Sequence, residues 1–95
     1  MTVGSAQRRQ ERKPRIEGQF SSADVEAALD LLHLADMAWH DCFGPRELEM
    51  PAQVLDDVLL LAGGNLAKLI RISRSAVLDF RDIRMAADSE RAKSR

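Results

Sequence analysis

The sequence predicts an all-α fold, a three-helix up-down-up hairpin bundle with helices at about residues 21–43, 51–62 and 65–88. Apolar residues recur at about 100° per residue in these three segments. Glycine or proline separates one segment from the next, and no segment alternates apolar and polar residues in the way of a strand. With 95 residues, 45% of them apolar and 31% charged, the chain fits one small domain.

Residues 1–19 precede the helices and are expected to form a disordered basic arm. They contain five basic and two acidic residues, a net charge of +3, together with Pro14 and Gly18. A segment with so few apolar residues buries too little surface to offset the entropy lost on ordering. Residues 20–88 then form a single helical domain, and residues 89–95 form a polar tail that frays.

The first helix begins at Ser21 or Ser22, either of which can cap it, and ends at the pair Gly44 and Pro45. The second starts at Pro51 and ends at the Gly63–Gly64 pair, after which Asn65 caps the third. The predicted core face of the first helix consists of Val25, Ala28, Leu29, Leu32, Ala35, Trp39 and Phe43. The stripes of the other two helices are Val54, Leu55, Val58, Leu61 and Ala62, then Leu66, Leu69, Ile70, Ala76, Val77, Phe80 and Ala87.

Additional apolar residues lie away from these core faces. Leu31, Leu34 and Ala38 point nearly opposite the main stripe of the first helix, and Leu59 and Leu60 lie off the stripe of the second. A helical domain of this size without a disulfide or a metal is marginal, and oligomerisation is a common remedy. We therefore predict a homodimer with a two-fold interface, and we assign these five residues to the surface that meets the second copy or another protein.

Asp36 falls within the apolar stripe of the first helix, and Arg84 lies in line with the stripe of the third. Buried charges are normally paired, because desolvating an isolated one costs several kcal/mol. We predict that Asp36 pairs with an arginine of the third helix, with Arg84 the first choice and Arg81 the second. The alternative is that either side chain reaches solvent at the edge of a thin bundle.

His33, Asp36 and His40 have the spacing i, i+3 and i+7, which places them on one side of a helix, where they are weak candidates for a metal site. Because a closed site needs a fourth ligand from elsewhere, ordinary amphipathic side chains are the preferred interpretation, and no metal or cofactor is predicted. The single cysteine, Cys42, is expected to act as a small apolar side chain. Without a convincing nucleophile or acid/base set, the sequence does not indicate an enzyme.

The segment 66–77 resembles the centre of the helix-turn-helix DNA-binding motif. Ala67 stands where the two helices would pack, and Ile72 and Ser73 open a recognition helix that Val77 anchors. The resemblance implies that Arg74 and Ser75 face the major groove. Arg71 occupies the position where that family usually has a turn glycine. The backbone conformation of Arg71 therefore distinguishes two hypotheses: a turn there favours the DNA-binding motif, and a helical conformation favours one continuous helix.

Charge is segregated along the chain: residues 20–65 carry a net charge of −8 and residues 66–95 a net charge of +4. Our leading hypothesis is a cytoplasmic, non-catalytic, regulatory protein-interaction module that binds itself and an unidentified protein partner, with a partner helix in an apolar groove. The alternative is a small DNA-binding regulator that uses Arg71, Arg74, Ser75 and Arg81 together with the basic arm. Apolar stretches are too short for a membrane span or a signal-peptide core, and the bias toward arginine is typical of a GC-rich bacterial genome.

Overall fold

A computed structural model describes residues 3–44 and 46–93, and every regular element within them is a helix. The predicted all-α class is confirmed, whereas the predicted number of three helices is wrong. One additional helix lies in the expected arm, and the predicted third helix is divided in two. In chain order the elements are α1 (Val3–Gln19), α2 (Val25–Phe43), α3 (Ala52–Ala62), α4 (Leu66–Leu78) and α5 (Phe80–Lys93).

Helix α1 replaces the expected disordered arm over residues 3–19; residues 1 and 2 lie outside the described part. It contains Pro14, which removes one backbone hydrogen bond from the helix. Two apolar residues, Ile16 in its last turn and Phe20 directly after it, are nonetheless buried in the common core. The end of α1 also approaches the turn between α3 and α4 so closely that a Cβ on Gly64 would collide with the carbonyl oxygen of Gln19. The arm is therefore an integral part of the fold.

The ends of the next two helices agree with the predicted stops. Gly44 follows α2 with φ at 104°, and Gly63 follows α3 in the left-handed conformation with φ at 55°. Both conformations are accessible to glycine at low steric cost. Asn65 caps α4, because its side chain accepts a hydrogen bond from the backbone N–H of Lys68. The predicted second position of the stop after α2, Pro45, lies outside the described residues.

The predicted helix 65–88 breaks at Asp79, between α4 and α5. Asp79 has an extended φ of −154°, and its Oδ1 accepts hydrogen bonds from the backbone N–H groups of Arg81 and Asp82 at 3.1 and 3.4 Å. Asp79 thus caps the start of α5. The sequence did not predict this cap, because the apolar stripe continues through this point. Helix α5 continues to Lys93, so residues 89–93 are helical and not the frayed tail that was predicted.

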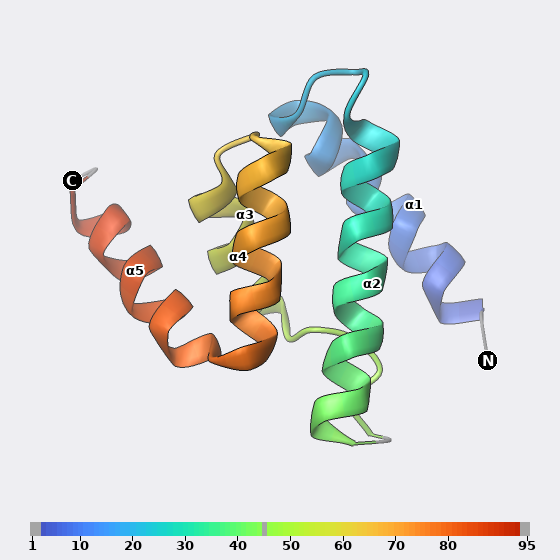
Figure 1. Cartoon of the computed structure of the whole chain (residues 1–95). Coiled ribbons are helices and arrows are strands. Elements are labelled where there is room, and N and C mark those ends of the chain that lie inside the picture. The colour runs from blue at the N-terminus through green and yellow to red at the C-terminus, as the bar shows by residue number, and fades with distance from the viewer. Residues whose placement is uncertain (1–2, 45, 94–95) are drawn as a thin grey trace.

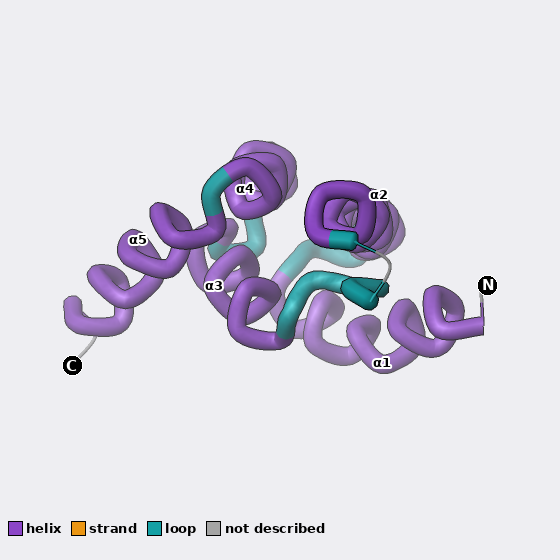
Figure 2. Tube along the Cα trace, turned by 90° about the horizontal axis from the view of Figure 1, so that it is seen from below, coloured by secondary structure: helices purple, strands orange, loops and turns teal. Residues whose placement is uncertain are grey.

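The helices form two layers. Figure 1 shows α2 and α4 side by side and running in the same direction, and the end-on view of Figure 2 places them in one layer above a row of α5, α3 and α1. The molecule is 20 Å across its thinnest dimension, the thickness of two helices of about 10 Å each. A two-layer helical molecule this thin has little interior and a large proportion of exposed helix surface.

The core lies between the two layers. Its fully buried large apolar side chains include Leu32 of α2, Val58 of α3 and Leu69 of α4. The predicted stripes are largely confirmed, but Phe43, Ile70 and Phe80 are at least about a third exposed, which the periodic pattern did not indicate. None of the described helices is both long enough and apolar enough to cross a bilayer.

Candidate functional site

An apolar groove separates the exposed sides of α2 and α4. Its α2 wall contains all three residues that the sequence predicted for a partner surface on this helix, Leu31, Leu34 and Ala38. The groove has a volume of about 240 Å³, and Ala35, Ser73, Arg74, Val77 and Leu78 complete its lining. The second apolar side of the first predicted helix therefore lines a concave surface against α4.

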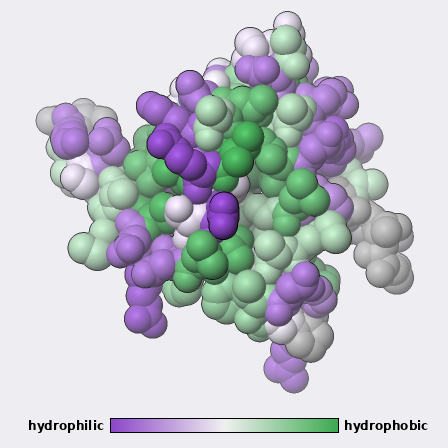
Figure 3. Space-filling model, viewed as in Figure 1, coloured by the Kyte–Doolittle hydropathy of each residue, from purple (hydrophilic) through white to green (hydrophobic). Residues whose placement is uncertain are grey.

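The edges of this α2–α4 groove expose two leucines that project beside it. Leu34 is 58% exposed and Leu78 is 76% exposed. Figure 3 shows hydrophobic atoms gathered over the middle of the face that carries α2 and α4, with a few hydrophilic atoms among them and more toward the sides. Arg74 is the one charged residue among those that line the groove. Exposed apolar surface concentrated around a hollow in this way is typical of protein-docking sites.

The other two predicted surface residues lie elsewhere. Leu59 is only 2% exposed and belongs to the core, so its assignment to a partner surface was wrong. Leu60 is exposed, but it borders a different hollow beside Gly63 and Gly64 at the turn between α3 and α4. The mistake for Leu59 arises because α3 is covered on more than one side, by α4 and α5, which a single stripe did not predict.

Asp36 is buried and paired, but its partners are not the predicted ones. Arg12 of α1 approaches it with two nitrogen atoms, Nη1 at 2.7 Å from Oδ2 and Nη2 at 3.1 Å from Oδ1. Arg8 contributes a longer ion pair at 3.5 Å, and the backbone N–H of Met50 donates to Oδ1 at 3.0 Å. The predicted pair of Asp36 with Arg84 is therefore wrong. The expectation of a buried carboxylate matched to arginine holds with a different helix, one that the sequence did not predict.

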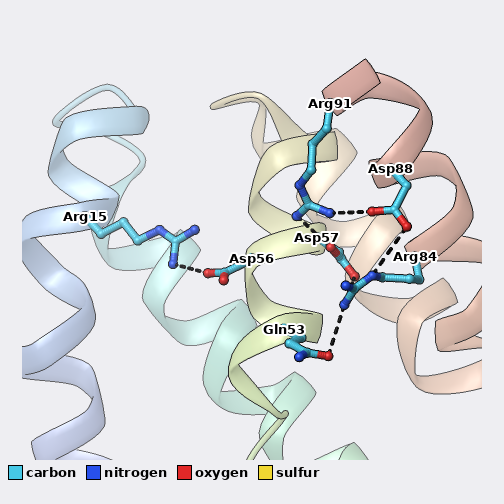
Figure 4. A network of polar contacts seen from close by, with 7 residues as sticks. All are labelled: Arg15, Gln53, Asp56, Asp57, Arg84, Asp88 and Arg91. Carbon is cyan, nitrogen blue, oxygen red and sulfur yellow. Dashed lines mark hydrogen bonds and ion pairs between the residues drawn. The ribbon is translucent and has the colours of Figure 1, made fainter. Parts of the chain in front are cut away.

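Arg84 instead pairs with a second buried carboxylate, that of Asp57 on α3. Figure 4 shows Arg84 and Arg91 of α5 converging on this carboxylate. Arg91 Nη2 lies 2.7 Å from Asp57 Oδ1, and Arg84 Nη1 lies 3.9 Å from Oδ2 and 3.1 Å from the amide oxygen of Gln53. The hydrogen bond to Asp57 raises the pKa of Arg91 above its ordinary value. Asp88 also pairs with both arginines.

The remaining arginines of α1 pair along the acidic surfaces of α2 and α3. Arg9 Nη1 lies 2.7 Å from Asp30, and Arg15 Nη1 lies 2.7 Å from Asp56, the contact at the left of Figure 4. The hydrogen bond to Asp30 raises the pKa of Arg9 above its ordinary value. The four arginines of the basic arm are thus occupied by intramolecular pairs with the acidic segment.

The weak metal candidates do not form a site. Asp36 is occupied by arginines, and His40 Nδ1 lies 3.1 Å from the carbonyl oxygen of Glu47. Across the part of the chain that the structure describes, no three His, Cys, Asp or Glu side chains gather closely enough to hold a metal ion. By their spacing, His33, Asp36 and His40 lie on one side of a helix. Asp36 is nevertheless buried against α1, so its carboxylate does not share an open site with the two histidines.

The turn that the helix-turn-helix resemblance implies at Arg71 is contradicted, because Arg71 lies in the middle of α4. Arg71, Arg74 and Ser75 are all exposed on this single helix, together with Lys68. Among the described residues, no acidic side chain pairs with any of the three α4 bases. Three bases without an acidic partner in the described structure therefore share α4, the helix that forms one wall of the groove.

Comparison with known proteins gives no match to a family model, to a curated protein or to a solved structure.

Proposed function

We propose that this chain is a non-catalytic protein-interaction module that forms a homodimer through the α2–α4 groove. The observation that carries the proposal is the groove itself, an apolar hollow flanked by the exposed side chains of Leu34 and Leu78. In a two-fold dimer the same patch serves on both copies, so a surface that carries both a hollow and projecting leucines can be complementary to itself. Burial of these leucines provides the main driving force.

Two exposed charges on α2 and α4 support an antiparallel pairing. Asp41 lies two helical turns after Leu34 on α2, and Arg71 lies two turns before Leu78 on α4. Both side chains are exposed. Because α2 and α4 run in the same direction (Figure 1), a two-fold axis perpendicular to both helices reverses the second copy, which moves Asp41 of one copy toward the level of Arg71 in the other. Opposite charges at the rim favour the correct orientation of the two copies.

Analytical ultracentrifugation tests the homodimer directly. We expect a dimer at tens of micromolar, and we expect Leu34→Asp to sediment as a monomer because it places a charge in the apolar interface. Leu48→Asp is the matched control, since Leu48 is 64% exposed and does not line the groove. A wild-type monomer under these conditions, or equal behaviour of the two variants, would refute the proposed interface.

A charge exchange tests the orientation of the copies. Asp41→Arg and Arg71→Asp should each weaken the dimer, because each places like charges opposite one another. The double variant should recover much of the lost affinity. If the loss of dimer affinity in the double variant equals the sum of the losses in the two single variants, the antiparallel arrangement is wrong, even if the dimer still forms.

Nucleic-acid binding is the second candidate, and the unpaired bases of α4 are the observation that favours it. Lys68, Arg71 and Arg74 are exposed without an acidic partner among the described residues, and Arg81 lies further along on α5. The measurement is binding to nonspecific duplex DNA as the salt concentration is raised. Each phosphate contact contributes about 0.9 to the slope of log affinity against log salt, so Arg71→Gln should lower that slope. Arg9→Gln, which alters an arginine already paired with Asp30, is the control.

A further inference from the structure

A second hollow lies between α2, α3 and α5, away from the groove. It has a volume of about 520 Å³, within the range of about 300–1,000 Å³ that small-molecule sites occupy. It shares no lining residue with the α2–α4 groove. This hollow, the α5 cavity, is lined in part by Trp39, Asp57, Phe80, Arg81, Arg84 and Met85.

Aromatic side chains form one wall of the α5 cavity. The ring centroids of Trp39 and Phe80 are 5.7 Å apart, and the Phe43 ring packs against both, with centroid distances of 4.2 Å to Trp39 and 6.2 Å to Phe80. Trp39 is only 4% exposed, so its indole is held in place by the core. The buried Nε1 of this indole has no hydrogen-bond partner in the described structure. Val54 and Met85 add aliphatic surface to the cavity. A fixed aromatic wall of this kind suits an apolar ligand body.

The polar lining of the cavity is predominantly positive. Its one carboxylate, that of Asp57, is already paired with Arg91, which does not line the cavity, and is also approached by Arg84. Arg81 differs from Arg84 because its guanidinium has no acidic partner among the described residues. Its nearest described interaction is with the Phe80 ring, whose centroid lies 6.0 Å from Cζ. The cavity therefore offers an uncommitted guanidinium beside an apolar wall.

We propose that the α5 cavity binds a small amphipathic carboxylate. The apolar body of the ligand lies against Trp39 and Phe80, and its carboxylate pairs with Arg81 at the rim. A guanidinium binds a planar carboxylate through two parallel hydrogen bonds, a geometry that a neutral or cationic head group does not offer. Arg84, held by Gln53 and Asp57, adds positive potential on the same side.

The test is a titration with decanoate, below its micelle concentration, followed by tryptophan fluorescence. Trp39 is the only tryptophan of the chain, so any change in emission reports on this wall of the cavity. We expect saturable binding of decanoate and about tenfold weaker binding of the uncharged 1-decanol, since a charge-assisted hydrogen bond is lost. Equal binding of the two probes, or no saturable change with decanoate, would overturn the proposal.

Two variants and a matched control locate the head group. Arg81→Gln should weaken decanoate binding by about tenfold and leave 1-decanol binding unchanged. Met85→Glu, at a lining residue that is 71% exposed, should also weaken decanoate binding by adding a like charge at the rim. Arg74→Gln removes an exposed arginine outside this cavity and should have no effect. If Arg81→Gln and Arg74→Gln bind decanoate equally, Arg81 is not the carboxylate site.

Binding of decanoate to the α5 cavity does not depend on the homodimer proposal. Leu34 does not line the α5 cavity, so Leu34→Asp should abolish dimerisation while decanoate still binds. A dimer that binds no decanoate would overturn the cavity proposal alone.

Discussion

Helix α2 lies between two helices that are held to it by different forces. On one side, α1 presents Arg8, Arg9 and Arg12 to the acidic residues of α2 and of the connector that follows it. On the other side, α4 buries Leu69 and Ala76 in the core. The comparison shows that a helix with almost no apolar stripe can be ordered by a row of arginines, provided that its partner surface supplies matching carboxylates and a few apolar anchors such as Ile16.

Removing the central carboxylate of the charged side should have the largest effect. Asp36→Ala leaves Arg12, whose side chain is 11% exposed, without its closest partner and removes the acceptor of the Met50 N–H. Breaking a buried pair by removing one partner costs about 3–5 kcal/mol, so we expect a loss of about 4 kcal/mol in unfolding free energy, measured by urea denaturation. Asp36→Asn, which keeps an acceptor for Met50, should lose less. A loss below about 1 kcal/mol for Asp36→Ala would show that α1 is held by other contacts.

Truncating the apolar side should have a similar but slightly smaller effect. Leu69 is fully buried, and leucine-to-alanine changes in cores cost about 2–5 kcal/mol, so Leu69→Ala should lose about 3 kcal/mol.

The same denaturation at about 0.1 M and about 1 M NaCl separates the two sides, because the Debye length falls from about 10 to about 3 Å. Amide protection of α1 should decrease in high salt, whereas protection of α4 should not. Equal loss of protection in both helices would remove the distinction between them.

A substitution of Asp57 tests whether α5, like α1, is held in place by ion pairs. Asp57→Asn weakens the hydrogen bonds that Arg91 and Arg84 donate, but both arginines are partly exposed and can turn to water. We expect the melting temperature to fall by about 5–10 °C, a smaller effect than that of Asp36→Ala. Thermal unfolding followed by circular dichroism measures it. A shift as large as that of Asp36→Ala would mean that α5 depends on charge as strongly as α1 does.

An exposed pair of the charged side should have the smallest effect. Arg15 and Asp56 form a 2.7 Å contact, but their side chains are 41% and 51% exposed. Surface pairs contribute about 0–1 kcal/mol, so Arg15→Gln should lose less than about 1 kcal/mol in the same urea experiment. A loss comparable to that of Asp36→Ala would indicate that the arginines of α1 act as one cooperative network.

Much of the helical framework could be predicted from the sequence, and the groove could be predicted in part. The period of apolar residues placed α2, α3 and the start of α4 to within a few residues, because that period reports which side of a helix is buried. The same pattern singled out Leu31, Leu34 and Ala38, which line the groove. It missed α1, whose inward face is formed by arginines, and it missed the capping role of Asp79 because the apolar stripe continues through the break.

Partner choice could not be predicted in the same way. Asp36 was expected to be buried and paired, and it is, but with Arg12 at a separation of 24 residues in place of Arg84. The α5 cavity could not be predicted from the sequence either, because its lining side chains come from three helices and from the connector before α3.

The amino-acid sequence by itself determined which segments form most of the helices, where several of them end and that two opposite charges would need compensation. These properties depend on neighbouring residues along the chain, since hydrogen bonding and capping in a helix act within a few residues. The tertiary structure decided which arginine meets which carboxylate, and thereby whether the basic arm is ordered. Electrostatic pairing depends on distance in space, and only the packing of α1 and α5 against their neighbours fixes those distances.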